Sequence, residues 1–352
     1  MKNFIISFLF VLLITLSSQT ACGQQVIYPD KEWEKADPEK YGFSAEKLEA
    51  LKAYIIDSMR TTGLSVIIDG EQIFEFGSLK RVSYIASCRK SVLAMMYGKY
   101  VENGTIDLNK KISELGIDDV QGLLPLERVA TVKDLIKARS GVYHPASNPG
   151  DDTANSPERG SKKPGSYFLY NNWDFNVAGA IFEMLTGENI YEAFQKDIGV
   201  QIDLQDYQLS LQKKGGDPQR SKYPAYHFYF STRDMARIGY LMLRNGKWKN
   251  RQVVSESWVK EITAVHTPLD EMNPLSRRNY FGYGYMWWIW DNNVSPEAFK
   301  GAYTARGAIG QYITILPKYN MVIAHKTDSV YNRSTKWDNY YKFLQMLLEC
   351  IK

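Results

Sequence analysis

The sequence predicts an α+β fold in which an antiparallel sheet is flanked by helices and interrupted by an inserted, mostly helical lobe. Runs rich in aromatic and β-branched residues lie near both ends of the chain, whereas helical patterns dominate its middle. Strands from the two ends are therefore expected to join in one sheet. This gives a sheet lobe of about residues 30–104 and 246–352 and a helical lobe of about residues 105–245.

The composition is that of an ordinary globular protein. With 352 residues, of which 44% are hydrophobic, the chain can bury one large core or two smaller ones. Its net charge of +4 is small, and the basic residues are scattered rather than gathered in a stripe. A nucleic-acid partner is therefore not expected.

The first residues have the pattern of an export signal. Lys2 precedes an apolar stretch from Phe4 to Leu16, and small residues lead to Cys22. The apolar stretch is too short to span a bilayer comfortably. We expect residues 1–22 to direct export to the periplasm, after which the chain is either cleaved simply or attached to the membrane by a lipid on Cys22. Gln19 stands where a lipoprotein signal usually has Leu, which favours simple cleavage.

The small number of cysteines argues against a disulfide scaffold and against a structural zinc site. Cys88 and Cys350 are the cysteines certain to remain after processing, too few for a disulfide scaffold or a structural zinc site. No metal and no organic cofactor is expected.

The first elements have clear boundaries. Ser44 is a typical N-cap for an amphipathic helix over residues 45–60. Two β-rich runs around Asp69 and Gly70 predict a hairpin. A helix from Ser87 to about Val101 is apolar on nearly all sides, which predicts that it is buried.

The middle of the chain alternates helical patterns with loops. Patterns at residues 131–139, 176–187 and 233–246 predict helices. The segment 140–168 has almost no periodicity, and a loop of that length inside a compact domain is usually functional. Its acidic residues could bind a substrate amine, but solvent exposure is the favoured interpretation; they are Asp151, Asp152 and Glu158.

The last third returns to strand patterns. A helix is expected at residues 255–263, strands at 280–290, 310–317 and 321–327, and a closing helix at 336–351. Trp287 and Trp288 are neighbours on one of these strands, so at most one of them can face a cleft.

One serine and one lysine could form a catalytic pair. The pattern S-x-x-K occurs four times, but only Ser87 follows a strand and turn and opens a strongly apolar helix. Lys90 lies one turn further on the same face. Burial would lower the pKa of this lysine and make it a base for the serine hydroxyl. Alternatively, Lys90 reaches solvent or pairs with an acid, and Ser87 merely caps the helix.

A second motif is rarer. Of 24 tyrosines, only Tyr170 has an Asn two places on, at Asn172. A tyrosine beside a lysine can share its proton, and an Asn amide can orient both the lysine and a substrate. The alternative is that Asn171 and Asn172 only form a turn and cap the helix that follows.

Together, Ser87-x-x-Lys90 and Tyr170-x-Asn172 resemble the penicillin-recognising serine hydrolases: class C β-lactamases, D,D-peptidases, β-lactamase-fold esterases and 6-aminohexanoate-dimer hydrolase. The segments "ASCRKSV", "TVKDLIKARSG" and "AYHFYFSTRDMARIGYLMLRNGKW" resemble its esterase and amide-hydrolase branch, over about residues 40 to 350. The resemblance implies a β-lactamase/transpeptidase-like fold. It also implies that Ser87 is acylated, that Lys90 takes its proton, that Tyr170 passes a proton to the leaving group and that Asn172 positions the substrate.

The family's third motif departs from the usual pattern here. It should fall in "YTARGAIGQY", where Gly307 fits the glycine but no Lys or His precedes it, and Arg306 is the nearest cation. The resemblance implies an oxyanion hole formed by the backbone N–H groups of Ser87 and Ala308, with Ile309 as the rival for Ala308. The missing Lys argues against β-lactamase activity and favours a neutral or differently charged ester or amide.

Two further residues could belong to the site. Cys88 as a thiol nucleophile is disfavoured because it lies beside the serine and points elsewhere on the helix. His227 could line the acyl pocket, but a packed, hydrogen-bonded imidazole is the favoured interpretation.

Three functions remain after these considerations. An esterase or amide hydrolase acting on a small molecule is the leading prediction. A β-lactamase or D,D-peptidase would use the same nucleophile, and a catalytically inactive envelope binding protein is the third candidate.

Overall fold

The computed structural model describes residues 26–352. The predicted signal at residues 1–22 and the lipidation candidate Cys22 lie outside this range and stay predictions. Within it, no helix is long and apolar enough to cross a membrane.

An eight-stranded sheet is built from both ends of the described chain, as the sequence predicts. Its strand order is β1-β3-β2-β14-β13-β12-β11-β10, antiparallel except for the parallel pair β1 and β3. The strands from the first part are β1 (Glu34–Lys35), β2 (Gly63–Ile68) and β3 (Glu71–Gly77); those from the last part are β10 (Phe281–Tyr283), β11 (Trp288–Trp290), β12 (Tyr303–Gly307), β13 (Gln311–Leu316) and β14 (Met321–Lys326). The predicted α+β class with an antiparallel sheet is confirmed.

The predicted hairpin is the turn between β2 and β3. Asp69 and Gly70 both have positive φ, at 53° and 89°. A two-residue turn of this kind matches the right-handed twist of the strands it joins, and Asp-Gly adopts it readily.

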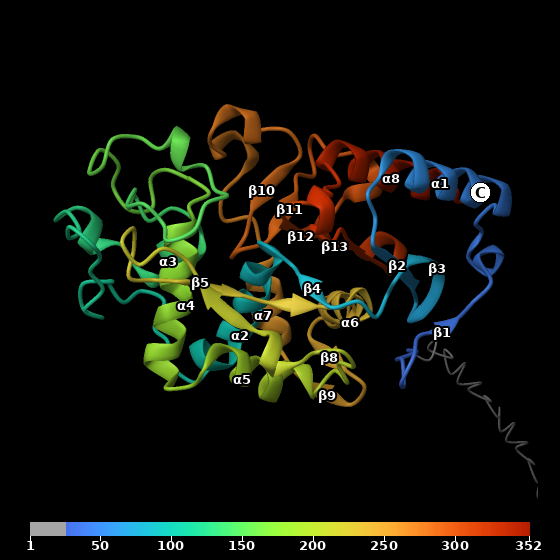
Figure 1. The fold of residues 1–352 in the computed structure, drawn as a ribbon, viewed down its shortest axis with the longest axis horizontal. Helices are drawn as coiled ribbons and strands as arrows, with labels where there is room; N and C mark the ends of the chain where they lie inside the picture. Colours follow the sequence, from blue (N-terminus) through green and yellow to red (C-terminus); the bar gives the residue numbers. More distant parts are fainter. Residues whose placement is uncertain (1–25) are drawn as a thin grey trace, which may run out of the picture.

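Helices cover both faces of the sheet (Figure 1). α1 (Ala45–Ser58) packs beside α8 (Trp337–Glu349) on one face, and α6 (Thr232–Leu243) packs on the other. The alternation along β13 explains this arrangement. Tyr312 stacks on Tyr340 of α8, whereas the next residue, Ile313, contacts α6 at Gly239.

The position of α6 differs from the predicted division into lobes. By number it falls inside the segment 105–245 assigned to the helical lobe, yet it packs on β2, β13 and β14. Gly239 allows this close approach, because a Cβ there would lie 2.5 Å from Cγ1 of Val322.

The rest of the middle segment forms a separate, mostly helical layer beside the sheet, on the left in Figure 1. α2 (Cys88–Glu102) lies at the junction and contacts β12, α4 and α7. The other helices of this middle segment are α3 (Val132–Ile136), α4 (Asn172–Thr186) and α5 (Ile190–Phe194). α7 (Glu256–Ile262) follows it, before the chain re-enters the sheet at β10. Short strand pairs link the segments: β4 (Ser83–Tyr84) with β7 (Tyr229–Phe230), β5 (Lys213–Gly215) with β6 (Ala225–His227), and β8 (Lys247–Trp248) with β9 (Arg251–Gln252).

Candidate active site

A cavity of about 270 Å³ opens where the start of α2 meets the end of β12. Ser87 and Tyr170 line it, together with Gly307, Ala308 and Ile309 of the third-motif segment. Residues from three distant parts of the sequence therefore meet at one cavity. This is the junction between the sheet and the helical layer, where ligand sites commonly form.

The amine of Lys90 is the centre of a buried hydrogen-bond network. Its Nζ lies 3.0 Å from Oγ of Ser87, 2.8 Å from Oη of Tyr170 and 2.7 Å from Oδ1 of Asn172. Lys90 is 1% exposed, so the alternative in which it reaches solvent is wrong. Within residues 26–352 no carboxylate forms an ion pair with it. The geometry brings together all four residues that the two motifs single out.

The surroundings of Lys90 favour its neutral form. Burial is the main cause that lowers its pKa well below the usual lysine value, and the charge of Arg89 acts in the same direction. Burial also raises the pKa of Tyr170. A neutral amine has a lone pair that can accept the Ser87 hydroxyl proton, while its N–H groups can donate to Asn172 and Tyr170. The arrangement is therefore chemically able to deprotonate Ser87.

The long loop before Tyr170 orients Asn172. Nδ2 of Asn172 donates to the carbonyl of Pro149 at 3.0 Å, which directs Oδ1 toward Lys90. The backbone N–H of Asn172 donates to a carboxylate oxygen of Asp151 at 2.9 Å. The expectation that Asp151 is a solvated loop residue is therefore wrong.

Asp152 is also anchored rather than solvated. Its carboxylate accepts two hydrogen bonds from the guanidinium of Arg277, both at 2.9 Å, and its backbone N–H donates to the carbonyl of Tyr170. A bidentate pair of this kind fixes geometry as well as charge. Of the three acidic loop residues, only Glu158 is exposed as expected. Sequence reasoning did not identify Arg277, because nothing in its local sequence indicates a partner 125 residues away.

Steric contacts explain why the third motif has a glycine at position 307. A Cβ on Gly307 would lie 2.6 Å from the carbonyl oxygen of Ile85 and 3.2 Å from Cβ of Ala86. Ala86 itself has a positive φ of 48° and forms the turn immediately before Ser87. The end of β12 thus packs directly against the turn that presents Ser87. This contact places the backbone of Ser87 and Ala308 at the same cavity, as an oxyanion hole would require.

The cation of the third motif also faces the cavity. Arg306 lines it, and its guanidinium lies 4.9 Å from the ring centroid of Trp288, which lines it too. Trp287 instead packs against Tyr303, with ring centroids 5.4 Å apart. The prediction that at most one of the two tryptophans faces the cleft is confirmed, since Trp288 lines the cavity and Trp287 does not. Two further lining residues, Lys336 and Trp337, had no sequence signal.

Two other candidates lie away from the cavity. His227 is not among its lining residues, and its ring packs edge-on against Tyr84 at 4.9 Å, which is the packed imidazole of the favoured interpretation rather than the pocket alternative. Burial lowers the pKa of His227 to about 4. Cys88 is buried and its Sγ donates to the carbonyl of Gln311, consistent with a thiol directed away from Ser87. Within residues 26–352, no group of three or more His, Cys, Asp or Glu side chains is arranged to hold a metal.

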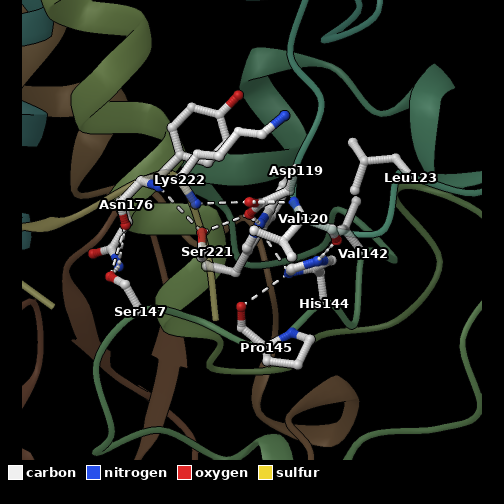
Figure 2. Close-up of polar contacts among 12 residues, drawn as sticks. Asp119, Val120, Leu123, Val142, His144, Pro145, Ser147, Asn176, Ser221 and Lys222 are labelled. Atoms are coloured by element: carbon white, nitrogen blue, oxygen red, sulfur yellow. Dashed lines mark hydrogen bonds and ion pairs between the residues drawn. The ribbon is translucent and has the colours of Figure 1, made fainter. Parts of the chain in front are cut away.

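A second buried polar cluster supports the start of α4 (Figure 2). The carboxylate of Asp119 accepts hydrogen bonds from Nε1 of Trp173 at 2.7 Å and from Oγ of Ser221 at 2.5 Å. It also accepts from the backbone N–H groups of Val120 and Lys222. Since Trp173 follows Asn172 directly, this cluster holds the segment that carries the Asn172 amide.

Known proteins share this architecture. The structure named "Putative 6-aminohexanoate-dimer hydrolase from Bacillus anthracis" superposes with a TM-score of 0.67 at 21% identity, covering 92% of this chain and 88% of that one. EstCE1, a hydrolase with promiscuous acyltransferase activity, gives 0.63 at 14% identity, with 87% and 98% covered. The octameric penicillin-binding protein homologue from Pyrococcus abyssi gives 0.63 at 19%, with 86% and 77% covered. At these identities the likeness shows the fold.

Sequence comparisons extend the likeness. An uncharacterized protein of Alkalihalophilus pseudofirmus is 21% identical over 267 residues, which are 70% of this chain and 73% of that protein. The family model described as Beta-lactamase matches residues 59–346. This match spans more than half of the chain and includes both motifs and the third-motif segment. The protein with the Ser87, Lys90, Tyr170 and Asn172 network therefore belongs to the Beta-lactamase family.

Proposed function

We propose that this protein hydrolyses a small-molecule ester or amide through a covalent acyl intermediate on Ser87. The observation that supports the proposal most strongly is the Lys90 amine. It is buried, has no acidic partner in the described chain, and lies 3.0 Å from the Ser87 hydroxyl. Burial in this form makes a lysine a base near neutral pH.

In the proposed acylation, Oγ of Ser87 attacks the substrate carbonyl carbon and its proton passes to Nζ of Lys90. The backbone N–H groups of Ser87 and Ala308 would stabilise the negative charge on the carbonyl oxygen. The bond to the leaving alcohol or amine then breaks. Tyr170, 2.8 Å from Nζ of Lys90, is placed to pass the proton to the leaving group.

Deacylation reverses these roles. Water attacks the acyl-serine ester and gives a proton to the Lys90 and Tyr170 pair. The ester bond to Oγ of Ser87 then breaks, the pair returns the proton to Oγ, and the carboxylic acid leaves. Asn172 would keep the Lys90 amine in position throughout, since its Oδ1 accepts from Nζ at 2.7 Å. Every step uses side chains, backbone amides and water.

The test is intact-protein mass after incubation with a fluorophosphonate, with 4-nitrophenyl butyrate and with a cephalosporin, using Ser87→Ala as the control. We expect an adduct or turnover with the fluorophosphonate and the ester that is lost in Ser87→Ala. Turnover of the cephalosporin alone would assign β-lactamase activity instead. No reaction with any reagent would contradict catalysis and favour an envelope binding protein.

We also propose that the protein acts outside the cytoplasm, in the periplasm or attached to the membrane by a lipid on Cys22. The amino-terminal pattern of Lys2, the apolar stretch and the small residues supports this. The mass of the mature amino-terminal peptide from cells tests it. Simple cleavage leaves an unmodified terminus, a lipoprotein carries an acylated Cys22, and an uncleaved terminus would contradict export.

A further inference from the structure

The turn between β12 and β13 has an unusual backbone conformation. It consists of Ala308, Ile309 and Gly310, and the last two have positive φ, at 61° and 100°. A three-residue hairpin loop usually needs a left-handed residue only at its last position. Ile309 is β-branched, and a β-branched side chain makes this conformation costly. Such a conformation persists only where surrounding contacts impose it, and it is common at active sites.

The same turn carries one of the two proposed oxyanion donors. Ala308 lines the cavity beside Ser87. Within residues 26–352, the backbone N–H groups of Ala308 and Ser87 donate to no acceptor. Both groups are therefore free to bind the carbonyl oxygen of a substrate. Because such a donor stabilises charge only when it already points at the oxygen, the contacts that fix this turn matter for the reaction.

Two hydrogen bonds hold the turn from outside. Nδ1 of His325, on β14, donates to the carbonyl of Gly310 at 2.9 Å. The backbone N–H of Thr335 donates to the carbonyl of Ile309 at 3.1 Å. Gly310 is also closely packed, since a Cβ there would lie 2.8 Å from Oγ1 of Thr327. Of the two bonds, the one from His325 comes from a side chain and can be removed by substitution.

The surroundings of His325 determine which ring nitrogen carries the proton. The side chain is buried, and burial lowers its pKa to about 4, so the ring is neutral at neutral pH. A neutral imidazole has one donor and one acceptor. Nδ1 faces the Gly310 carbonyl, which can only accept, so Nδ1 carries the proton. Nε2 lies 2.9 Å from Oγ1 of Thr61 and accepts from that hydroxyl.

We propose that His325 is a positioning residue for the oxyanion hole: its Nδ1–H group holds the turn so that the N–H of Ala308 points into the cavity. His325 does not line the cavity and acts only through the turn. This inference rests on the proposed acyl-serine function. The rival explanation is that His325 only packs against Tyr312 and Tyr340, whose ring centroids lie 5.8 and 5.3 Å from that of the imidazole.

Two substitutions separate these explanations, because both remove the ring. In His325→Asn, the amide nitrogen can take the place of Nδ1 and donate to Gly310. In His325→Gln, the longer side chain places its amide near the position of Nε2, beside Thr61, and leaves Gly310 without a donor. The experiment measures kcat and KM for 4-nitrophenyl butyrate in the wild type and in both variants, with active-site titration to count the folded enzyme.

We expect His325→Gln to lower kcat about 10- to 100-fold, less than the loss of a whole oxyanion donor, and to change KM less than about 3-fold. The affinity for butylboronic acid, which forms a tetrahedral adduct with a serine oxygen, should fall together with kcat. His325→Asn should stay within about 3-fold of the wild type in both. Both variants should melt at similarly lowered temperatures, because both lose the ring. Equal kcat in the two variants, or losses that follow the melting temperature, would overturn the proposal.

Two structural measurements separate this proposal from the catalytic one. In the wild type, nitrogen NMR at neutral pH should show the proton on Nδ1 of His325, and a proton on Nε2 would overturn the proposal without any variant. Crystal structures should show the turn in place in His325→Asn and displaced in His325→Gln. This result without Ser87-dependent turnover would contradict only the proposed catalysis. Ser87-dependent turnover with the turn in place in both variants would contradict only the role of His325.

Discussion

Two buried polar clusters lie near the start of α4, and each surrounds one ionisable side chain with hydrogen-bond partners. In one, the carboxylate of Asp119 accepts four hydrogen bonds of 2.5 to 2.7 Å. His144 lies 3.5 Å from that carboxylate, and both of its ring nitrogens contact backbone carbonyls (Figure 2). In the other, the Lys90 amine has only the uncharged partners Ser87, Tyr170 and Asn172.

The difference separates a structural cluster from a reactive one. The protein replaces the water lost by the Asp119 carboxylate with four hydrogen-bond donors, which hold it in place. Lys90 also has three hydrogen-bond partners, but burial and the charge of Arg89 lower its pKa, and its neutral form is favoured. Burial and hydrogen bonding are therefore common to both clusters, and what indicates chemistry at Lys90 is its lowered pKa beside the Ser87 hydroxyl.

The largest effect is expected at the Lys90 cluster. Lys90→Met should lower kcat/KM by up to about 10⁴-fold, because the serine loses its base. The variant should fold normally, since it removes a buried amine and keeps a similar volume. Steady-state kinetics and a thermal melt check both parts. Wild-type turnover in Lys90→Met would show that Lys90 is not the base.

The difference in stability between the wild type and Lys90→Met should depend on pH. The folded pKa of Lys90 lies below the unfolded value of about 10.4. Between these two values the unfolded chain binds more protons, so Lys90 makes the free energy of unfolding rise with pH. Below the folded pKa this contribution is lost. The wild type should therefore gain stability relative to Lys90→Met across that window, measured by urea titration at several pH values.

At the Asp119 cluster we expect a loss of stability rather than a loss of activity. Asp119→Ala leaves four buried donors without an acceptor and should lower the free energy of unfolding by about 3 to 5 kcal/mol. Asp119 has no contact with Ser87 or Lys90 in the structure. Urea titration measures the loss, and active-site titration should show that the fraction still folded turns over at close to the wild-type rate. A stable but inactive variant would assign Asp119 to the chemistry.

A smaller effect is expected for the phenol of the reactive cluster. Tyr170→Phe removes the hydroxyl 2.8 Å from Nζ of Lys90 but keeps the ring that packs on Trp288. We expect kcat to fall about 100-fold, at the lower end for a general acid or base. Esters with good leaving groups should be less affected than those with poor ones. An equal loss for both would argue against proton transfer to the leaving group.

The smallest effect is expected in the long loop before Tyr170, at the pair between Asp152 and Arg277. Asp152→Asn keeps the shape of the side chain but removes the charge that pairs with Arg277. Because the pair is partly exposed, we expect KM to rise less than about 10-fold with little change in kcat. The double variant Asp152→Asn/Arg277→Gln should cost no more than either single change. A large loss of kcat would place this pair in the chemistry itself.

The fold was predictable where local signals were strong. Asp69 and Gly70 specify their turn by backbone conformation alone. The four network residues were predictable because Ser87 and Lys90 share one helix turn and Tyr170 and Asn172 lie on either side of a helix start. The resemblance to a known family supplied the link between these two pairs.

Contacts between distant segments were not predictable. The Arg277 and Asp152 pair joins two aperiodic loops, and the rings around Arg306 come from β10, β11 and α8. No pattern in one segment indicates such a partner in another. The partner of His227 could not be named for the same reason, since its packing on Tyr84 joins segments more than 140 residues apart.

The pH dependence of the acylation rate tests the central claim most directly, namely that Lys90 is a base because it is buried without an acidic ion-pair partner in the described chain. The burst of 4-nitrophenol release from 4-nitrophenyl butyrate would be measured from pH 5 to pH 10 in the wild type and in Lys90→Met. The account predicts a burst rate that rises with pH to a plateau, with a midpoint well below the ordinary lysine value of about 10.4, and no such rise in Lys90→Met. A rise centred near the ordinary lysine value, or the same profile in both proteins, would contradict it.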